Sequence, residues 1–511
     1  MAESRHGASR PDADTGTGER RTRARPTAVG ARSQVVLALV CAAQFMVVLD
    51  VSVVNVALPS IQRALGFTAG GLPWVATAYA LTFGGFLLLG GRLADLYGHR
   101  RVLAAGLALF TAASLAGGLA GGAGVLIAAR AVQGLGAAVL APVTLTVLTA
   151  TFPEGAARTR ALAVWTAVSL AGGAAGNLVG GALTEYATWR SILLVNVPIG
   201  VAALAGLLTG AVPLTGHETR AGAAPTRAHG QANGRSGSRA GGLDVPGAVL
   251  ATGGLAAVTY AVAPGEGRAA AVTAAAWAVG AAALAGFAVV EARVAARPLL
   301  PPGLLRLRAI WLGNVVMLLA GAAFQVPMWY FLTLYMQNVL HLGALATGLG
   351  FLPHTVLTLA VGLRVTPWLM RRVHSRVLIT AGVWVAAAGF AWQSRAGAAD
   401  TYWTGVAGPA VLLSVGGALF NTPLTSTVTA GVDRADAGAA SGLMNTAKQV
   451  GGALGLAALV AVTTGGTHAD TRAEVGGAVL TSQYGQAFAL TAAALAVVGV
   501  LALWLPARRD D

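Results

Sequence analysis

The sequence is poor in the residues that most enzymes and secreted domains depend on. It has one cysteine, Cys41, so no disulfide can form within the chain and no multi-cysteine metal or cluster site is possible. Only 10% of its residues are charged, against about a quarter in soluble domains. No G-x-x-x-x-G-K-[ST], H-E-x-x-H or G-x-S-x-G stretch occurs, which argues against direct ATP hydrolysis and common hydrolytic chemistry. We expect no enzymatic activity, no bound metal and no cofactor.

Hydrophobic residues make up 56% of the 511 positions and gather in long runs. A run of about 18 to 25 apolar residues is long enough to cross a bilayer as a helix. The sequence therefore predicts an all-α integral membrane protein with about fourteen helices, arranged as six, two and six. The expected spans are 34–58, 73–91, 102–122, 124–149, 160–182, 191–212, 245–263, 270–290, 309–336, 343–364, 377–393, 403–427, 440–463 and 484–505.

Polar segments divide these helices into domains. We expect a disordered cytoplasmic tail at 1–33, because this Arg-rich stretch has too little apolar surface to fold. The run that follows is too long for a cleavable signal and is the first membrane helix. The other expected boundaries are an N-terminal bundle at 34–212, a cytoplasmic Gly/Ala/Arg-rich linker at 213–244, two extra helices at 245–292, a cytoplasmic loop at 293–308, a C-terminal bundle at 309–505 and a cytoplasmic tail at 506–511.

The formal net charge of +15 would suggest a nucleic-acid partner in a soluble protein. Here the Arg residues lie between apolar runs, so the charge indicates topology instead. With both termini inside, most of the basic residues fall in cytoplasmic segments, as the positive-inside rule requires. The basic residues left outside are Arg63, Arg190, Arg268, Arg395 and Arg472. We therefore predict cytoplasmic termini, a lipid bilayer as surroundings and no nucleic acid.

A charged stretch, Gly91 to Arg101, separates the second and third spans and reads G-R-L-A-D-L-Y-G-H-R-R. Gly91 and Gly98 allow a tight turn, Asp95 supplies an anion, and Arg100 and Arg101 face the negative cytoplasmic leaflet. This stretch resembles the loop 2–3 signature of the major facilitator superfamily. The resemblance implies that Asp95 with Arg100 and Arg101 braces the cytoplasmic side when it is closed. A weaker match at 369–376, in the second half, is consistent with a parallel repeat of two six-helix halves.

Asp50 lies inside the first span, where a carboxylate is costly and is retained when it lines a cavity or handles a proton. Arg130, on the fourth span, lies at a similar depth, so the two side chains can meet if their helices are neighbours. We interpret Asp50 as the proton carrier and Arg130 as the group that modulates it. A static ion pair, or an Arg130 that extends outward to the membrane surface, is the alternative.

Several stretches resemble motifs of the fourteen-helix drug:proton antiporter branch of that superfamily. They include Leu49 to Ile61, and Arg130 followed by Gln133, Gly134 and Gly136. In the branch this Arg is assigned to proton transfer. Trp189 to Gly200 and Ser441 to Gly452 resemble two further stretches of the branch, the second with Lys448 where Arg is usual. Lys448 is the only lysine, and either a role in transport or a structural tether fits it.

The fifth span carries a stripe of glycines that lets helices approach closely, which we expect at the interface between the halves. It resembles the antiporter motif Gly-Pro-x-x-Gly-Gly, but asparagine replaces the proline, and this departure weakens the inference of export direction. The alternative is a packed glycine face with no effect on direction. The gating residues predicted here are Gly172, Gly176, Asn177, Gly180 and Gly181.

Polar and aromatic residues in the second half are candidates for a substrate cavity. His354 can titrate near neutral pH, and Gln325, Trp329 and Tyr330 can bind planar or cationic molecules by stacking. All four can equally pack against neighbouring helices.

The resemblance spans roughly residues 34 to 505 and implies proton-coupled export of small amphipathic or cationic drugs or antibiotics, conferring resistance. The implied protein is a monomer in the bacterial cytoplasmic membrane, without a cofactor and driven by the proton gradient. Two alternatives stay open at this point. One is a proton symporter that imports a nutrient on the same fold, and the other is a non-transporting membrane scaffold.

Overall fold

The computed structural model describes residues 31–209, 244–264, 268–294, 303–397, 399–430, 432, 436–464 and 477–506. Over these ranges the chain is helical and no strand occurs. Fourteen of the described segments are long and apolar enough to cross a membrane. The protein is therefore an all-α multi-pass membrane protein, as the apolar runs predict. The predicted tails and the linker at 213–244 lie almost entirely outside the described residues.

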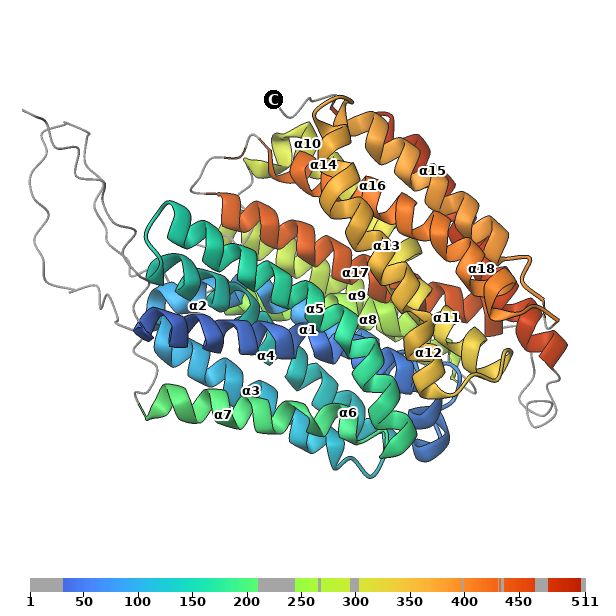
Figure 1. Cartoon of the computed structure of the whole chain (residues 1–511), viewed down its shortest axis with the longest axis horizontal. Coiled ribbons are helices and arrows are strands. Elements are labelled where there is room, and N and C mark those ends of the chain that lie inside the picture. The colour runs from blue at the N-terminus through green and yellow to red at the C-terminus, as the bar shows by residue number, and fades with distance from the viewer. Residues whose placement is uncertain are drawn as a thin grey trace, which may run out of the picture.

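The first six spans form one bundle, coloured blue to green in Figure 1. Its helices are α1 (Ala31–Leu65), α2 (Trp74–Tyr97), α3 (His99–Gly118), α4 (Ala123–Thr151), α5 (Ala156–Tyr186), and the pair α6 (Ser191–Leu194) and α7 (Asn196–Leu208), which make one span. The span breaks at Val195 because Pro198 has no N–H to donate to the carbonyl of Leu194. The two extra helices are α8 (Val245–Val262) and α9 (Ala270–Val289).

The last six spans form the second bundle, coloured yellow to red (Figure 1). They are α10 (Arg308–Ala320) with α11 (Val326–Asn338), α12 (Ala344–Gly350) with α13 (Leu352–Ala360) and α14 (Thr366–Met370), then α15 (Ser375–Gln393), α16 (Gly408–Thr429), α17 (Ala437–Thr464) and α18 (Gly477–Ala502). Short π-helical turns join α10 to α11 and α13 to α14. The match at 369–376 falls at the α14–α15 junction, equivalent to the α2–α3 junction of the first bundle.

We name the two ends of the molecule after glycines in its loops. The Gly98 end holds the α2–α3 turn, and the Gly66 end holds the α1–α2 loop. At the Gly66 end α5 packs on α12, and Gln337 on α11 donates a hydrogen bond of 2.8 Å to the carbonyl of Val56 on α1. Among the described helices α5 makes no comparable contact with α13 or α14, which continue that span towards the Gly98 end.

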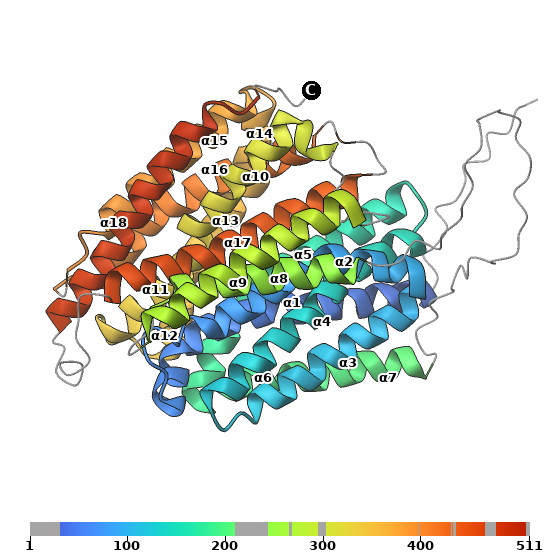
Figure 2. The ribbon, with the colours of Figure 1, turned by 180° about the vertical axis from the view of Figure 1, so that it is seen from behind.

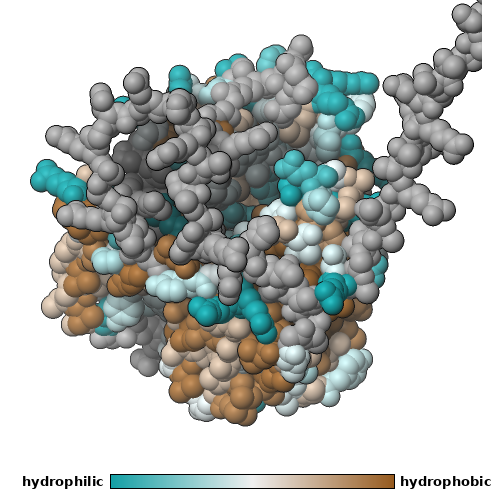
Figure 3. All heavy atoms as spheres, turned by 90° about the vertical axis from the view of Figure 1, so that its left-hand side faces the viewer, coloured by the Kyte–Doolittle hydropathy of each residue, from teal (hydrophilic) through white to brown (hydrophobic). Residues whose placement is uncertain are grey.

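The second contact between the bundles joins α2 to α17, where the Thr446 hydroxyl donates a hydrogen bond of 2.7 Å to the carbonyl of Gly84. Helix α8 lies along this seam and touches both helices, as the reverse view shows (Figure 2). The Gly98 end faces the viewer in Figure 3, where the surface is hollowed above its brown, apolar lower part. On the α5 side the bundles are therefore closed together at the Gly66 end and apart at the Gly98 end.

The α2–α3 turn is tighter than the sequence predicts. Helix α2 continues to Tyr97 and α3 begins at His99, so Gly98 alone makes the turn. Its φ of 86° lies in the region that only glycine adopts easily. Gly91, predicted to share the turn, instead lies within α2, so that part of the expectation is wrong.

Replacing Gly98 by alanine should destabilise the folded protein by about 1–3 kcal/mol. A Cβ atom at Gly98 would meet no atom within 4 Å, so the cost is purely that of the backbone conformation. Gly122 is the matched control, because it is equally open but has an extended backbone with φ of −163°. Thermal unfolding in detergent should show a lowered midpoint for Gly98→Ala and an unlowered midpoint for Gly122→Ala. Equal midpoints for both variants would show that the turn is not strained for alanine.

Candidate functional site

The predicted pair of Asp50 and Arg130 meets in the interior of the first bundle. Asp50 lies in the middle of α1 with no exposed surface, and Arg130 on α4 is 2% exposed. An Arg130 guanidinium nitrogen lies 2.5 Å from Asp50 Oδ2. The two side chains thus make a direct, charge-assisted hydrogen bond, which is among the stronger kinds in proteins. The two residues lie at a shared depth, as predicted, and their side chains are in contact. Arg130 does not extend to the surface.

Two amide side chains bind the other carboxylate oxygen of Asp50. Gln133 Nε2 donates to Oδ1 at 2.6 Å, and Asn196 Nδ2 donates to the same atom at 2.9 Å. Gln133 also donates to the hydroxyl of Ser114 at 2.8 Å. Both carboxylate oxygens are therefore satisfied by protein donors from α4 and α7, as a buried charge requires.

Arg130 is held on its other sides by α2. Its Nε donates to the carbonyl of Val75 at 3.0 Å, and its guanidinium lies 4.5 Å from the ring centre of Tyr79. The same guanidinium donates to Gln133 Oε1 at 2.7 Å. The site thus links α1, α2, α3, α4 and α7. A change of charge on Asp50 would alter contacts that involve every one of these helices.

The charges of Asp50 and Arg130 balance each other within the site. The buried pair is neutral overall, and loss of either charge would leave the other uncompensated in the interior of the bundle, which is costly. A second ion pair, between Arg158 and Glu154, lies on the surface with the Glu154 side chain 89% exposed. Its contribution to stability is small for that reason.

Sequence reasoning missed the roles of Gln133 and Asn196. Gln133 lies three residues after Arg130, so both side chains point from one face of α4, and this spacing was the available signal. Asn196 starts α7 directly after the break at Val195. Its motif was recognised, but no spacing in the sequence places α7 against α1.

Three of the predicted gating glycines pack within one bundle instead of between the two. Cβ atoms built at Gly172, Gly176 and Gly180 would lie 3.2 Å or less from atoms of α1, the closest being 2.5 Å between Gly176 and the Ser52 Cβ. Only Gly181 faces the other bundle, where a Cβ would lie 2.6 Å from the carbonyl oxygen of Ala344. The expected position at the interface between the halves is therefore wrong for Gly172, Gly176 and Gly180. It is right for Gly181.

Asn177, which replaces the motif proline, is 2% exposed and lies within an unbroken α5. The backbone of Asn177 is covered by Gly348 of α12, where a side chain would overlap its carbonyl oxygen. The Oδ1 atom of Asn177 has no hydrogen-bond partner among the described residues. An asparagine here leaves α5 unbroken, as its backbone N–H allows, and α5 keeps its contact with α12.

The side chain of Arg100 binds the C-terminal end of another helix. Its guanidinium donates to the carbonyls of Leu207 and Leu208 at 2.8 and 3.3 Å, at the C-terminus of α7. A cation there satisfies carbonyls that lack intrahelical partners. Arg101 is exposed, and the side chain of Asp95 lies outside the described residues.

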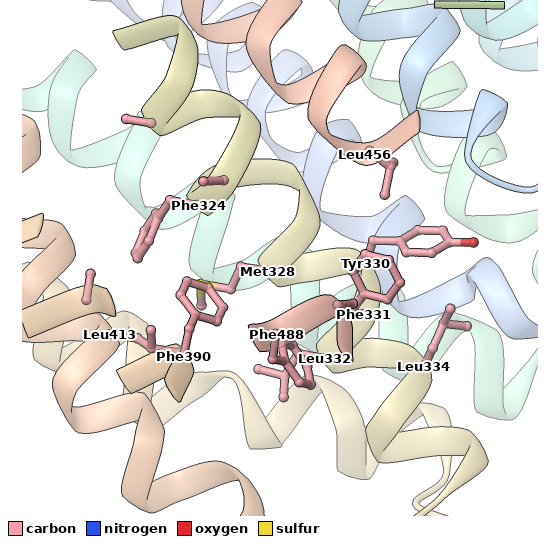
Figure 4. Packing of buried hydrophobic residues seen from close by; sticks show 14 of the residues in the cluster. Phe324, Met328, Tyr330, Phe331, Leu332, Leu334, Phe390, Leu413, Leu456 and Phe488 are labelled. Atoms are coloured by element: carbon pink, nitrogen blue, oxygen red, sulfur yellow. The ribbon is translucent and has the colours of Figure 1, made fainter. Parts of the chain in front are cut away.

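The candidate cavity residues separate into different environments. Tyr330 is 3% exposed and belongs to the apolar cluster of Figure 4, with its ring edge-to-face on Phe331 at 5.2 Å. Trp329 is partly exposed and lies edge-to-face with His354, whose Nδ1 is 2.8 Å from the Ser414 hydroxyl. These contacts place Tyr330 in the core, while Trp329 and His354 lie together.

Two candidates remain. The side chain of Gln325 lies outside the described residues. Lys448 is partly exposed on α17. Its backbone carbonyl lies against Gly321 and occupies the space that a side chain at that position would need. No hydrogen bond or ion pair of its ammonium group is recorded within the described part of the chain.

The described chain has twelve spans in two bundles and two further helices between them in sequence, with a satisfied charged pair buried inside the first bundle. The chain belongs to the Major Facilitator Superfamily, whose model matches residues 40–456, and is therefore a multi-pass membrane transporter and not an enzyme. It is 52% identical over 475 residues to a cephamycin export protein from Amycolatopsis lactamdurans, covering 92% of each chain. It is 40% identical to a puromycin resistance protein from Streptomyces alboniger, covering 91% of this chain and 89% of that one.

The fold is also that of solved transporters. A crystal structure of peptide transporter POT superposes with a TM-score of 0.64 at 16% identity, covering 91% of this chain and 93% of that one. At so low an identity this likeness concerns the fold alone.

Proposed function

We propose that this protein is a proton-coupled antiporter that exports small antibiotic molecules across the bacterial cytoplasmic membrane. The observation that carries the proposal is the buried carboxylate of Asp50, held by Arg130 and two amides inside a transporter fold. The functions of the relatives at 52% and 40% identity, cephamycin export and puromycin resistance, support an antibiotic as cargo.

The Gly98 end is assigned to the cytoplasm, since its loops carry the excess of arginine. In the conformation described, the bundles part at this end on the α5 side, so cargo enters from the cytoplasm. Cargo binding displaces a proton from Asp50 to the cytoplasm. The bundles then close at the Gly98 end and open at the Gly66 end, where cargo leaves and the carboxylate takes a proton from outside.

The proposal makes one monomer sufficient, because the charged site lies wholly within one bundle of one chain. It needs no cofactor, since the proton gradient supplies the driving force. Trp329 and His354 are the residues of the second bundle that we place at the cargo site. Asp50 and Arg130 are the proton-coupling residues, and Gly181, Gly348 and Asn177 form the contact that opens when the Gly66 end opens.

Everted membrane vesicles that contain the protein test this function. Adding cephamycin or puromycin to respiring vesicles should release protons from the vesicle interior while the drug accumulates inside. A proton uncoupler should abolish the accumulation, and the surface variant Glu154→Gln should behave as the wild type. Accumulation that resists the uncoupler would refute proton coupling, and proton movement in the same direction as the drug would identify a symporter instead.

A further inference from the structure

Asn196 is one of the two amides that bind Asp50, and one of its own atoms lacks a partner in the described structure. Its Nδ2 donates to Asp50 Oδ1, but its own Oδ1 is buried and has no partner among the described residues. An unpartnered buried carbonyl is costly, and such groups in a native site call for an explanation.

The neighbouring amide is locked on both sides. Gln133 donates to Asp50 Oδ1 and to the Ser114 hydroxyl, while its Oε1 accepts a hydrogen bond from Arg130 at 2.7 Å. Turning this amide over would point its NH₂ group at the guanidinium of Arg130, where two donors would face each other. Gln133 can therefore only donate to the carboxylate.

The second carboxylate oxygen, Asp50 Oδ2, faces the guanidinium of Arg130 at 2.5 Å. A proton added there would meet a donor that cannot accept it. A proton added to Oδ1 meets two amide donors, of which Gln133 is fixed by Arg130 while Asn196 Oδ1 has no hydrogen bond within the described chain to lose on turning. Rotation of this amide by about 180° exchanges its NH₂ group for its Oδ1, at the same 2.9 Å from Asp50.

We propose that Asn196 is a positioning residue that reverses its amide when Asp50 is protonated, donating to the carboxylate and accepting from the carboxylic acid. This inference rests on the proposed function. In the protonation step a hydronium ion from the aqueous side gives up one O–H bond and becomes water, and a new O–H bond forms at Oδ1. The charge of Asp50 goes from −1 to 0 while Arg130 stays positive.

The other charged or titratable groups near Asp50 do not compete for this role. From α4 the site receives Arg130, which has no acceptor atom. From α2 it receives Tyr79, whose ring lies against Arg130 and whose buried hydroxyl makes no hydrogen bond in the described chain. The polar neighbours from α3 and α7 are Ser114, bound to Gln133, and Asn196 itself. Asn196 begins α7 after the break at Val195. Its reversal therefore changes the hydrogen bond between α7 and α1 according to the protonation state of Asp50.

Infrared difference spectra of the purified protein after a pH step test the reversal without any cargo. The carboxylic acid band of protonated Asp50 is identified by its loss in Asp50→Asn. In the wild type this band should lie at the lower frequency of an acid hydrogen-bonded to an amide. In Asn196→Leu, which has a similar shape without polar atoms, the band should move to the frequency of an unbonded acid.

The matched control is Asn314→Leu, since Asn314 on α10 is also a buried asparagine whose Oδ1 has no partner in the described structure. Its variant should leave the Asp50 band in place. Proton release on cephamycin addition to proteoliposomes should fall roughly tenfold or more in Asn196→Leu, as expected for a lost hydrogen bond to a buried charged group. Asn196→Ser, whose hydroxyl both donates and accepts, should restore part of it.

The outcomes separate the inference from the proposed function. If the wild type shows no Asp50 band or no drug-linked proton release, proton coupling itself fails. If the wild type has both, but Asn196→Leu keeps the band position and the release, only the reversal of Asn196 is refuted. Should Asn196→Leu not fold, Asn196→Ser against Asn196→Ala gives the same comparison between a side chain that can accept the proton's hydrogen bond and one that cannot.

Discussion

Replacing Asp50 by asparagine should abolish proton-driven drug accumulation in everted vesicles. The amide keeps the shape of the carboxylate but carries no titratable proton, so the transport cycle loses the group that exchanges the proton for cargo. The change also leaves Arg130 as an uncompensated charge in a site with 0% and 2% exposure. Removing one member of a buried pair costs about 3–5 kcal/mol, and the thermal midpoint should fall accordingly.

The chain offers a matched control for this variant. Glu154→Gln makes the same carboxyl-to-amide change in the exposed pair with Arg158 and should alter stability by no more than about 0.5 kcal/mol. A second variant separates stability from coupling. Asp50→Asn combined with Arg130→Gln removes both charges, so stability should recover while accumulation stays absent. Accumulation that survives Asp50→Asn and still responds to an uncoupler would place the proton on another residue.

Replacing Gly181 by valine should hold the Gly66 end open and stop transport. A Cβ at Gly181 would lie 2.6 Å from the carbonyl oxygen of Ala344 and 2.9 Å from the Cα of Leu345. Both are backbone atoms that cannot turn aside, so α12 must move away from α5. An exporter that cannot close this end cannot alternate, and drug accumulation should be lost while the protein still folds.

The distance between the two bundles at the Gly66 end can be measured with a spin label on each bundle. Because Cys41 is the only cysteine, Cys41→Ala gives a cysteine-free background for labels at Tyr186→Cys and Ala399→Cys, both exposed near the Gly66 end. Gly181→Val should shift the distance distribution to longer values. Gly173→Ala is the control, since a Cβ there lies 3.7 Å from the nearest atom, an ordinary contact. An unchanged distribution with normal transport would show that α12 accommodates the valine without opening.

The comparison of sequence and structure is most instructive at the charged site. Asp50 and Arg130 could be predicted because a charge within an apolar run is costly and stands out whatever the tertiary structure. Asn196 and Gln133 are uncharged amides, and only the spacing of Gln133 from Arg130 gives any indication along the chain that one of them is a partner of Asp50. Their roles follow only from the packing of α4 and α7 against α1.

For the glycine stripe of α5, too, the sequence predicts one part of the packing and the structure decides the rest. The spacing of Gly172, Gly176 and Gly180 predicts a close helix contact, but the neighbour on each face depends on how six helices are arranged in space. The structure places α1 on that face and α12 on the face of Gly181.

The sequence by itself determined the fourteen spans and marked Asp50 and Arg130 as charges within two of them. These follow from hydrophobicity and the cost of a charge in lipid, which act locally along the chain. Only the tertiary structure decided which helices meet, that Tyr330 lies in the core, that Arg100 caps α7, and that α8 lies along the α2–α17 seam. The physical reason is that contacts between helices depend on side-chain shape across residues far apart in sequence, and a periodic apolar pattern records only that a face is buried and not what covers it.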